Sequence, residues 1–169
     1  MEYLIVRQFV RSLKNLDVIL DKALKHAEAR KFDPDNLFGT RLFPDMLPFA
    51  TQIRIACDTA KSTAANLAGK EAPKHEDNEK TFAELRGRIA KCVAYLETFT
   101  EQDFANVKPD ALIKQPNRPG KALRARDYLI ARQIPNFYFH VTTAYDLLRS
   151  GGVELGKADY LGQLDFVEV

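Results

Sequence analysis

The histidines are the residues of this chain best suited to chemistry, because imidazole binds metals and exchanges protons near neutral pH. Three occur in the sequence. His26 lies near the end of a predicted first helix, where a cation is favourable against the helix dipole. His75 lies in a charged run that is typical of a solvated loop. Only His140 borders an apolar stripe, so we take it as the candidate functional histidine.

Polar residues accompany His140 along one edge of its predicted helix. Steps of three and four residues align Gln133, Asn136, His140 and Thr143 beside the apolar stripe. Buried polar groups cost about 1–3 kcal/mol unless they are paired. Gln52 borders the stripe of an earlier helix in the same way. Two interpretations stay open: a small-molecule pocket formed by Gln52, Asn136, His140 and Thr143, or a buried histidine that other protein groups satisfy.

Pro135 interrupts the helix that carries this polar line. A proline inside a helix removes one backbone hydrogen bond, here to the carbonyl of Ala131, and kinks the helix. We expect the kink to widen the space beside Asn136 and His140.

The signatures of common catalytic classes do not occur in the sequence. A zinc site needs three or four ligands, and the positions four residues from His140 hold Asn136 and Ala144. We therefore predict no metal and no other cofactor. The glycines form no phosphate-binding loop. Cys57 and Cys92 have no CxxC spacing, which favours two small buried apolar residues.

Four amphipathic helices must position these residues. Apolar side chains advance in alternating steps of three and four residues, which keeps them on one helix face. The stretches with this pattern cover residues 6–27, 46–67, 82–99 and 130–148. Together they predict an all-α four-helix bundle that forms a single domain over residues 1–169.

The segments between the helices carry their own signals. Asp45 is expected to cap the second helix, and Thr81 and Glu84 have the capping-box spacing at the start of the third. The link between these two helices is short. Residues 100–124 contain three prolines and form a long connection, which we expect to cross over the end of the bundle between helices three and four.

The charge pattern limits the partners. The net charge of +2 gives no strong global attraction to nucleic acid or to an anionic membrane. Residues 108–132 have a local net charge of +5 but only one aromatic residue, which favours a solvated loop over a nucleic-acid surface. Arg54, Asp58 and Lys61 have the spacing of an exposed charge ladder. No stretch approaches the ~20 apolar residues that span a bilayer, so we expect a cytoplasmic protein that binds neither nucleic acid nor membrane.

Over nearly its whole length the chain resembles an uncharacterised bacterial and fungal family of the DinB/YfiT-like metalloenzyme superfamily. The resemblance rests on the segments RLFPDMLPFATQIRIACDTAKSTAANLAG, PNFYFHVTTAYDLLRSGGVELGKADYLG, HAEARKFDP and TFAELRGRIAKCVAYLETF. It implies a DinB-like four-helix bundle with up-down-down-up helix order, commonly a homodimer.

The resemblance also implies where a metal would bind. Enzymes of this superfamily hold a divalent metal with one histidine from helix two and an HxxxH pair from helix four. Only His140 matches that pattern, since Asn136 or Ala144 stands at the pair's other position and the stretch around Gln52 has no histidine. We therefore favour a small-molecule-binding bundle without a catalytic metal. The alternatives are a divalent-metal-dependent hydrolase or thiol transferase, and a structural or interaction module.

Overall fold

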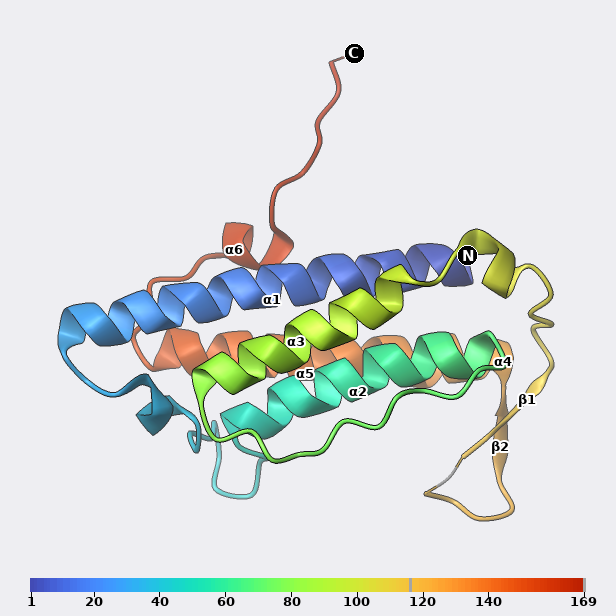
Figure 1. Cartoon of the computed structure of the whole chain (residues 1–169), viewed down its shortest axis with the longest axis horizontal. Coiled ribbons are helices and arrows are strands. Elements are labelled where there is room, and N and C mark those ends of the chain that lie inside the picture. Colours follow the sequence, from blue (N-terminus) through green and yellow to red (C-terminus); the bar gives the residue numbers. More distant parts are fainter. Residues whose placement is uncertain (116, 169) are drawn as a thin grey trace.

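The computed structural model describes residues 1–115 and 117–168, so Pro116 and Val169 lie outside it. Four long helical stretches pack side by side along one axis (Figure 1), and the predicted all-α bundle is confirmed. The stretches are α1 (Glu2–Arg30), α2 (Phe49–Leu67), α3 (Phe82–Glu97) and a fourth that runs through α4 (Ala125–Asp127), the π-helix η3 (Tyr128–Gln133) and α5 (Ile134–Ser150). Short helices cover Pro34–Leu37 (η1), Glu101–Phe104 (η2) and Lys157–Leu161 (α6).

The helix order is up-down-down-up. In Figure 1, α1 and α5 run in one direction, and α2 and α3 run in the other. Because α2 and α3 are parallel, the chain must return along the whole bundle between them, and residues 68–81 do so. We call this segment the crossover. The 19 residues of α2 span about 28 Å. The crossover, residues 68–81, covers this distance easily as an extended chain.

The predicted position of the crossover therefore needs correction. Residues 98–124 are long, as expected, but they leave α3 and reach α4 at the same end of the bundle (Figure 1). The link from helix two to helix three, predicted to be short, is the one that traverses the bundle. The prediction was wrong because it relied on the length of each connection. That length does not reveal whether the two helices it joins are parallel.

The four predicted apolar stripes meet in one hydrophobic core. Aromatic rings join its helices: the ring centroids of Phe9 and Phe137 are 4.2 Å apart, and Phe49 stacks on Phe82 at 5.4 Å. Cys57 and Cys92 are free and fully buried, as predicted. A hydrogen bond with Cys92 and burial raise the pKa of the Cys57 thiol, which makes it a poor nucleophile.

The helix starts follow local chemistry, with one difference from the prediction. Thr81 and Glu84 form the expected capping box, with bonds of 3.2 and 3.1 Å to each other's backbone N–H. Asp45 does not cap α2, which begins at Phe49 after an extended Pro48. The reason is steric: a residue that precedes a proline is disfavoured in the α region, so the helix cannot start before Pro48.

The long connection after α3 contains a hairpin that the sequence did not predict. Strand β1 (Leu112–Lys114) pairs antiparallel with β2 (Ala122–Arg124). The basic side chains of residues 108–132 are all exposed, which fits the prediction of a solvated segment. Among the helices that the structure describes, none has the length and apolar composition needed to cross a membrane.

Candidate functional site

The helix that carries His140 is irregular just before Pro135. Pro135 is the second residue of α5 and follows the π-helix η3, so a π-helical segment precedes the position where we expected a kink. The kink and the wider space beside Asn136 and His140 stay predictions. In a π-helix the backbone bonds join residues five apart, which brings such residues onto one face. Gln133 Nε2 accordingly donates to Tyr128 Oη at 2.6 Å.

Three hydrogen-bonded pairs cross between α2 and the fourth helical stretch. His140 Nδ1 lies 2.6 Å from Gln52 Oε1, Asn136 Nδ2 donates to Thr59 Oγ1 at 2.8 Å, and Asn66 Nδ2 donates to Tyr128 Oη at 2.8 Å. We call this row the polar seam. Its α2 members, residues 52, 59 and 66, recur every seven residues. Seven residues are close to two helical turns, so the three side chains face the same neighbouring helix.

The polar seam contains most of the predicted site. Gln52 and His140 bond directly to each other, and Asn136 lies one step along the seam with Thr59. Thr143 is buried as well, but its hydroxyl donates to the Phe139 carbonyl of its own helix at 2.7 Å. The structure therefore brings Gln52 and His140 together and does not connect Thr143 to them. A ligand-binding role for the four residues stays a prediction.

His140 sits at the edge of the core, with one ring nitrogen engaged and the other free. Its side chain is 7% exposed, and burial lowers its pKa below the usual 6.5. The partner Gln52 donates through Nε2 to the Leu47 carbonyl at 2.7 Å. Nε2 of His140 has no hydrogen-bond partner among the described residues, but this atom is not fully buried. It therefore retains access to solvent.

One aromatic side chain, Phe139, flanks this imidazole. The Phe139 ring stands edge-on to the His140 ring, with centroids 5.2 Å apart and an interplanar angle of 89°. Phe139 is 55% exposed and Leu47 is 46% exposed. Large exposed apolar side chains beside a buried polar group are the usual ingredients of a ligand site. The arrangement offers an apolar surface with one hydrogen-bonding nitrogen in it.

The donor set does not fit the metal centre that the resemblance implies. Within residues 1–115 and 117–168, no group of three or more His, Cys, Asp or Glu side chains is placed to hold a metal ion. The partners of His140 in the polar seam are amides and hydroxyls, and Nδ1 is occupied by Gln52. Neutral amide oxygens are weak ligands for a transition metal compared with imidazole or thiolate.

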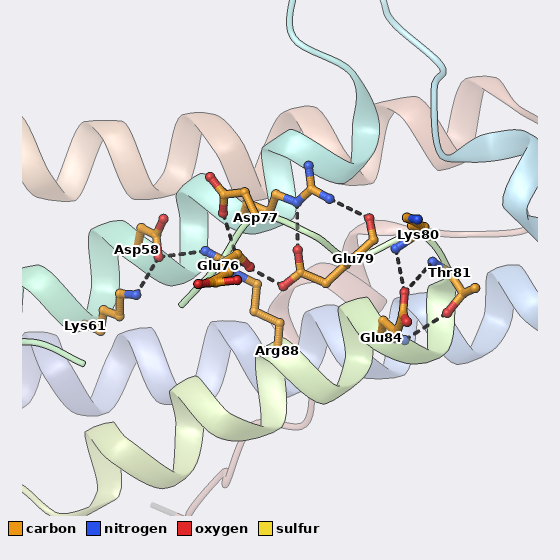
Figure 2. A network of polar contacts seen from close by, with 10 residues as sticks. Asp58, Lys61, Glu76, Asp77, Glu79, Lys80, Thr81, Glu84 and Arg88 are labelled. Atoms are coloured by element: carbon orange, nitrogen blue, oxygen red, sulfur yellow. Dashed lines mark hydrogen bonds and ion pairs between the residues drawn. The ribbon is translucent and has the colours of Figure 1, made fainter. Parts of the chain in front are cut away.

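A second polar cluster holds the crossover against α2 and α3, and the sequence did not reveal it. Arg88 of α3 is buried, and its guanidinium contacts carboxylates of Asp58, Asp77 and Glu79 at 2.8–3.0 Å (Figure 2). It also donates to the Glu76 carbonyl at 3.1 Å. We call these residues the Arg88 cluster. The only signal in the sequence was an arginine next to Ile89 in the apolar stripe of the third helix.

The Arg88 cluster changes the interpretation of the charges on α2. Lys61 pairs with Asp58 at 2.8 Å, as its spacing predicts, but its side chain is only 8% exposed. Arg54 bonds to Glu79 of the crossover at 2.8 Å and is 16% exposed. The prediction of an exposed ladder is therefore wrong for Arg54 and Lys61, whereas Asp58 between them is 41% exposed.

His75 was expected to be solvated, but the crossover buries part of it. Its Nδ1 is enclosed and has no hydrogen-bond partner among the residues that the structure describes, and the same is true of Arg88 Nε. Burial and the positive charges of Lys61 and Arg88 lower the pKa of His75. Protonation of this imidazole is thus unfavourable in the folded chain.

The electrostatics of the Arg88 cluster favour charged groups. Burial opposes the charged form of Arg88, but the hydrogen bond to Glu79 and the charge of Asp58 raise its pKa on balance. Burial by itself raises the pKa of the Glu79 carboxyl group. The hydrogen bonds from Arg88 and Arg54 outweigh this effect and lower the pKa below its usual 4.5. All these groups are engaged with one another, so the cluster anchors the crossover.

Two surface hollows lie away from the predicted site residues. One of about 850 Å³ lies between α1 and residues 154–159 and is lined by Lys22, His26 and Arg149 among others. Another, of about 450 Å³, lies beside the Arg88 cluster between residues 74–79 and the start of α3. Neither hollow is lined by Gln52, Asn136, His140 or Thr143.

Comparison with known proteins identifies the family. A model of a domain of unknown function, DUF1993, matches residues 2–161. The chain belongs to the DUF1993 family. A search of curated proteins finds no match for it.

A solved structure supports the DinB-like scaffold of this DUF1993 chain. It is the crystal structure of a DinB family member from Shewanella denitrificans, which is 49% identical in sequence. The alignment covers 97% of this chain and 93% of that chain with a TM-score of 0.92. The expectation of an uncharacterised DinB-like family is thus confirmed.

Proposed function

We propose that this DUF1993 chain binds a small organic molecule at the His140 end of the polar seam. The observation that carries the proposal is the His140 side chain, which is held at the core edge by Gln52 while Nε2 stays unpaired among the described residues. A buried imidazole that only stabilised the fold would gain from using both nitrogens. The exposed Phe139 and Leu47 supply apolar contact area for the body of a ligand.

A screen by thermal unfolding tests the proposal. Wild type is heated with members of a metabolite set and with zinc, nickel and manganese, beside His140→Leu and the control Gln133→Met. Gln133 belongs to the same helix face but bonds only to Tyr128 and Arg132. A ligand present at 100 times its Kd stabilises the fold by about 2.7 kcal/mol, which gives a clear rise in melting temperature.

Three outcomes separate the candidate functions. A metabolite that stabilises wild type and Gln133→Met but not His140→Leu supports the proposal. Stoichiometric metal that co-purifies with wild type and is lost in His140→Leu supports the hydrolase or thiol transferase alternative. Equal responses of all three proteins to every compound contradict a ligand site at His140.

The homodimer and the cytoplasmic location that we expect also stay proposals. The apolar side chains of Phe166 and Val167, which are 87% and 83% exposed, support association with a second copy. Sedimentation velocity over a range of protein concentrations tests the dimer. A single monomeric species at every concentration contradicts it.

A further inference from the structure

Three groups in a row fix the hydrogen positions at His140. They are the Leu47 carbonyl, the Gln52 amide and the His140 imidazole, joined by contacts of 2.7 and 2.6 Å. A backbone carbonyl can only accept a hydrogen bond. The Gln52 NH2 group must therefore face Leu47, which turns the Gln52 oxygen toward His140.

The orientation of Gln52 in turn determines the tautomer of His140. A carboxamide oxygen only accepts, so His140 Nδ1 must carry the hydrogen that lies between the two side chains. In a neutral imidazole the second nitrogen then has a bare lone pair. Burial favours the neutral form, since it lowers the pKa of His140. Nε2 is consequently a hydrogen-bond acceptor at neutral pH.

We propose that Gln52 is a positioning residue that holds His140 as the Nδ1–H tautomer, so that the site takes a neutral ligand with an O–H or N–H donor. This inference rests on the proposed function and names its ligand class. The donor group bonds to Nε2, and an apolar body lies against Phe139 and Leu47, which are both exposed. A carboxylate is disfavoured, because its oxygen lone pairs face the lone pair of Nε2 unless this nitrogen is protonated, and burial opposes that protonation.

The positioning role is tested without any ligand, by nitrogen-15 NMR of the histidine side chains near neutral pH. Wild type is expected to show a protonated Nδ1 and a bare Nε2 at His140. Gln52→Met removes the acceptor, so the proton is expected to move to Nε2. Gln52→Glu restores an acceptor oxygen and keeps Nδ1 protonated. The control Gln133→Met removes a different glutamine, one that bonds to Tyr128, and is expected to leave the His140 spectrum unchanged.

Two results overturn the positioning role. One is a wild-type spectrum in which Nε2 carries the proton. The other is a Gln52→Met protein with the wild-type tautomer. Should Gln52→Met fail to fold, wild type alone still decides, because the role requires the Nδ1–H form there.

The ligand class is tested with phenol and anisole, which share an aromatic body and differ in the O–H donor. Backbone amide signals of the labelled protein are followed during titration with each compound. We expect saturable shifts at residues 47–52 and 139–143, with phenol about tenfold tighter than anisole, the value of one net hydrogen bond. Gln133→Met keeps this preference, and Gln52→Met and His140→Leu lose it.

The outcomes separate the two proposals. Equal affinity for phenol and anisole at these residues overturns the need for a donor but leaves small-molecule binding standing. Shifts that map elsewhere, or no shifts with either compound, overturn the ligand class. The nitrogen-15 result judges the role of Gln52 in every one of these cases.

Discussion

The polar seam and the Arg88 cluster both include residues of α2, yet they are built from different chemistry. The seam uses neutral groups, and its hydrogen bonds join amides, hydroxyls and one imidazole. The Arg88 cluster uses full charges, and its guanidinium is shared by several carboxylates. Buried charges are tolerated only when they are paired. The cluster therefore commits its groups to holding the crossover, whereas the seam leaves His140 Nε2 available.

Removal of Arg88 should have the largest effect. Arg88→Met removes the cation shared by Glu79, Asp58 and Asp77, of which only Glu79, at 10% exposed, is largely buried. Breaking a buried ion pair costs about 3–5 kcal/mol. Because Glu79 keeps Arg54 and Asp58 keeps Lys61, we expect a loss at the lower end of this range. Urea unfolding of the variant measures the loss.

A matched control for Arg88 is Arg86→Met. Arg86 also pairs with two aspartates, Asp17 and Asp21, but its side chain is 34% exposed, so the expected loss is about 0–1 kcal/mol. Similar losses in the two variants would show that the Arg88 cluster behaves as an ordinary surface network.

The pair of His140 and Gln52 should show a smaller but coupled effect. Gln52→Met or His140→Leu alone leaves one buried polar group without its partner, which costs about 1–3 kcal/mol. The double variant should lose less than the sum, because neither half of the His140–Gln52 hydrogen bond is then left without its partner. A double-mutant cycle from urea unfolding measures the coupling. Strictly additive losses would contradict the bond as a stabilising contact.

The free energy of unfolding should also decrease as the pH is lowered, because of His140, which is buried, and His75, which is partly buried. The pKa of His140 and of His75 is lower in the folded chain than the usual 6.5, so the unfolded chain binds more protons below that pH. Their contribution is fully present above pH 6.5 and is lost as the pH falls toward the folded pKa. Each group gives a slope of at most about 1.4 kcal/mol per pH unit.

Unfolding free energies measured from about pH 7.5 to about pH 5.5 test this slope. His140→Leu should flatten the curve, and a further His75→Leu should flatten it more. An unchanged slope in the double variant would assign the pH dependence to other groups.

The smallest effect is expected at Thr143. Its hydroxyl bonds to a carbonyl of its own helix, and such bonds add little to helix stability. Thr143→Val should lower the unfolding free energy by about 0.5 kcal/mol, the low end for one net hydrogen bond, and leave the tautomer of His140 unaltered. A loss comparable to that of Gln52→Met would place Thr143 in the seam's network after all.

The helices were predictable because their signal is local. Apolar steps of three and four residues and the Thr81–Glu84 capping box depend on neighbours within a few turns, and the structure has both. The start of α2 was predictable in principle too, since Pro48 disfavours helix at Leu47. We predicted Asp45 as the helix cap from its side chain alone. The backbone restriction on the residue before Pro48 decided the start of the helix instead.

The candidate site was predictable in part. A polar line beside an apolar stripe singled out Asn136 and His140, and Gln52 stood out on α2 for the same reason. The bond between Gln52 and His140 was not predictable, because the residues are 88 positions apart and meet only when α2 packs against α5. Arg88 was missed, since an arginine in a stripe gives no sign of the carboxylates that will surround it.

By itself the sequence determined four amphipathic helices, their main boundaries and the polar residues at their edges, since hydrophobic periodicity and capping act over short stretches of chain. Tertiary structure alone decided that α2 and α3 run parallel, that residues 68–81 cover the charges of α2, and that His140 meets Gln52. The physical reason is that hydrogen bonds and buried ion pairs depend on distances of about 3 Å, which exist only after the helices have packed.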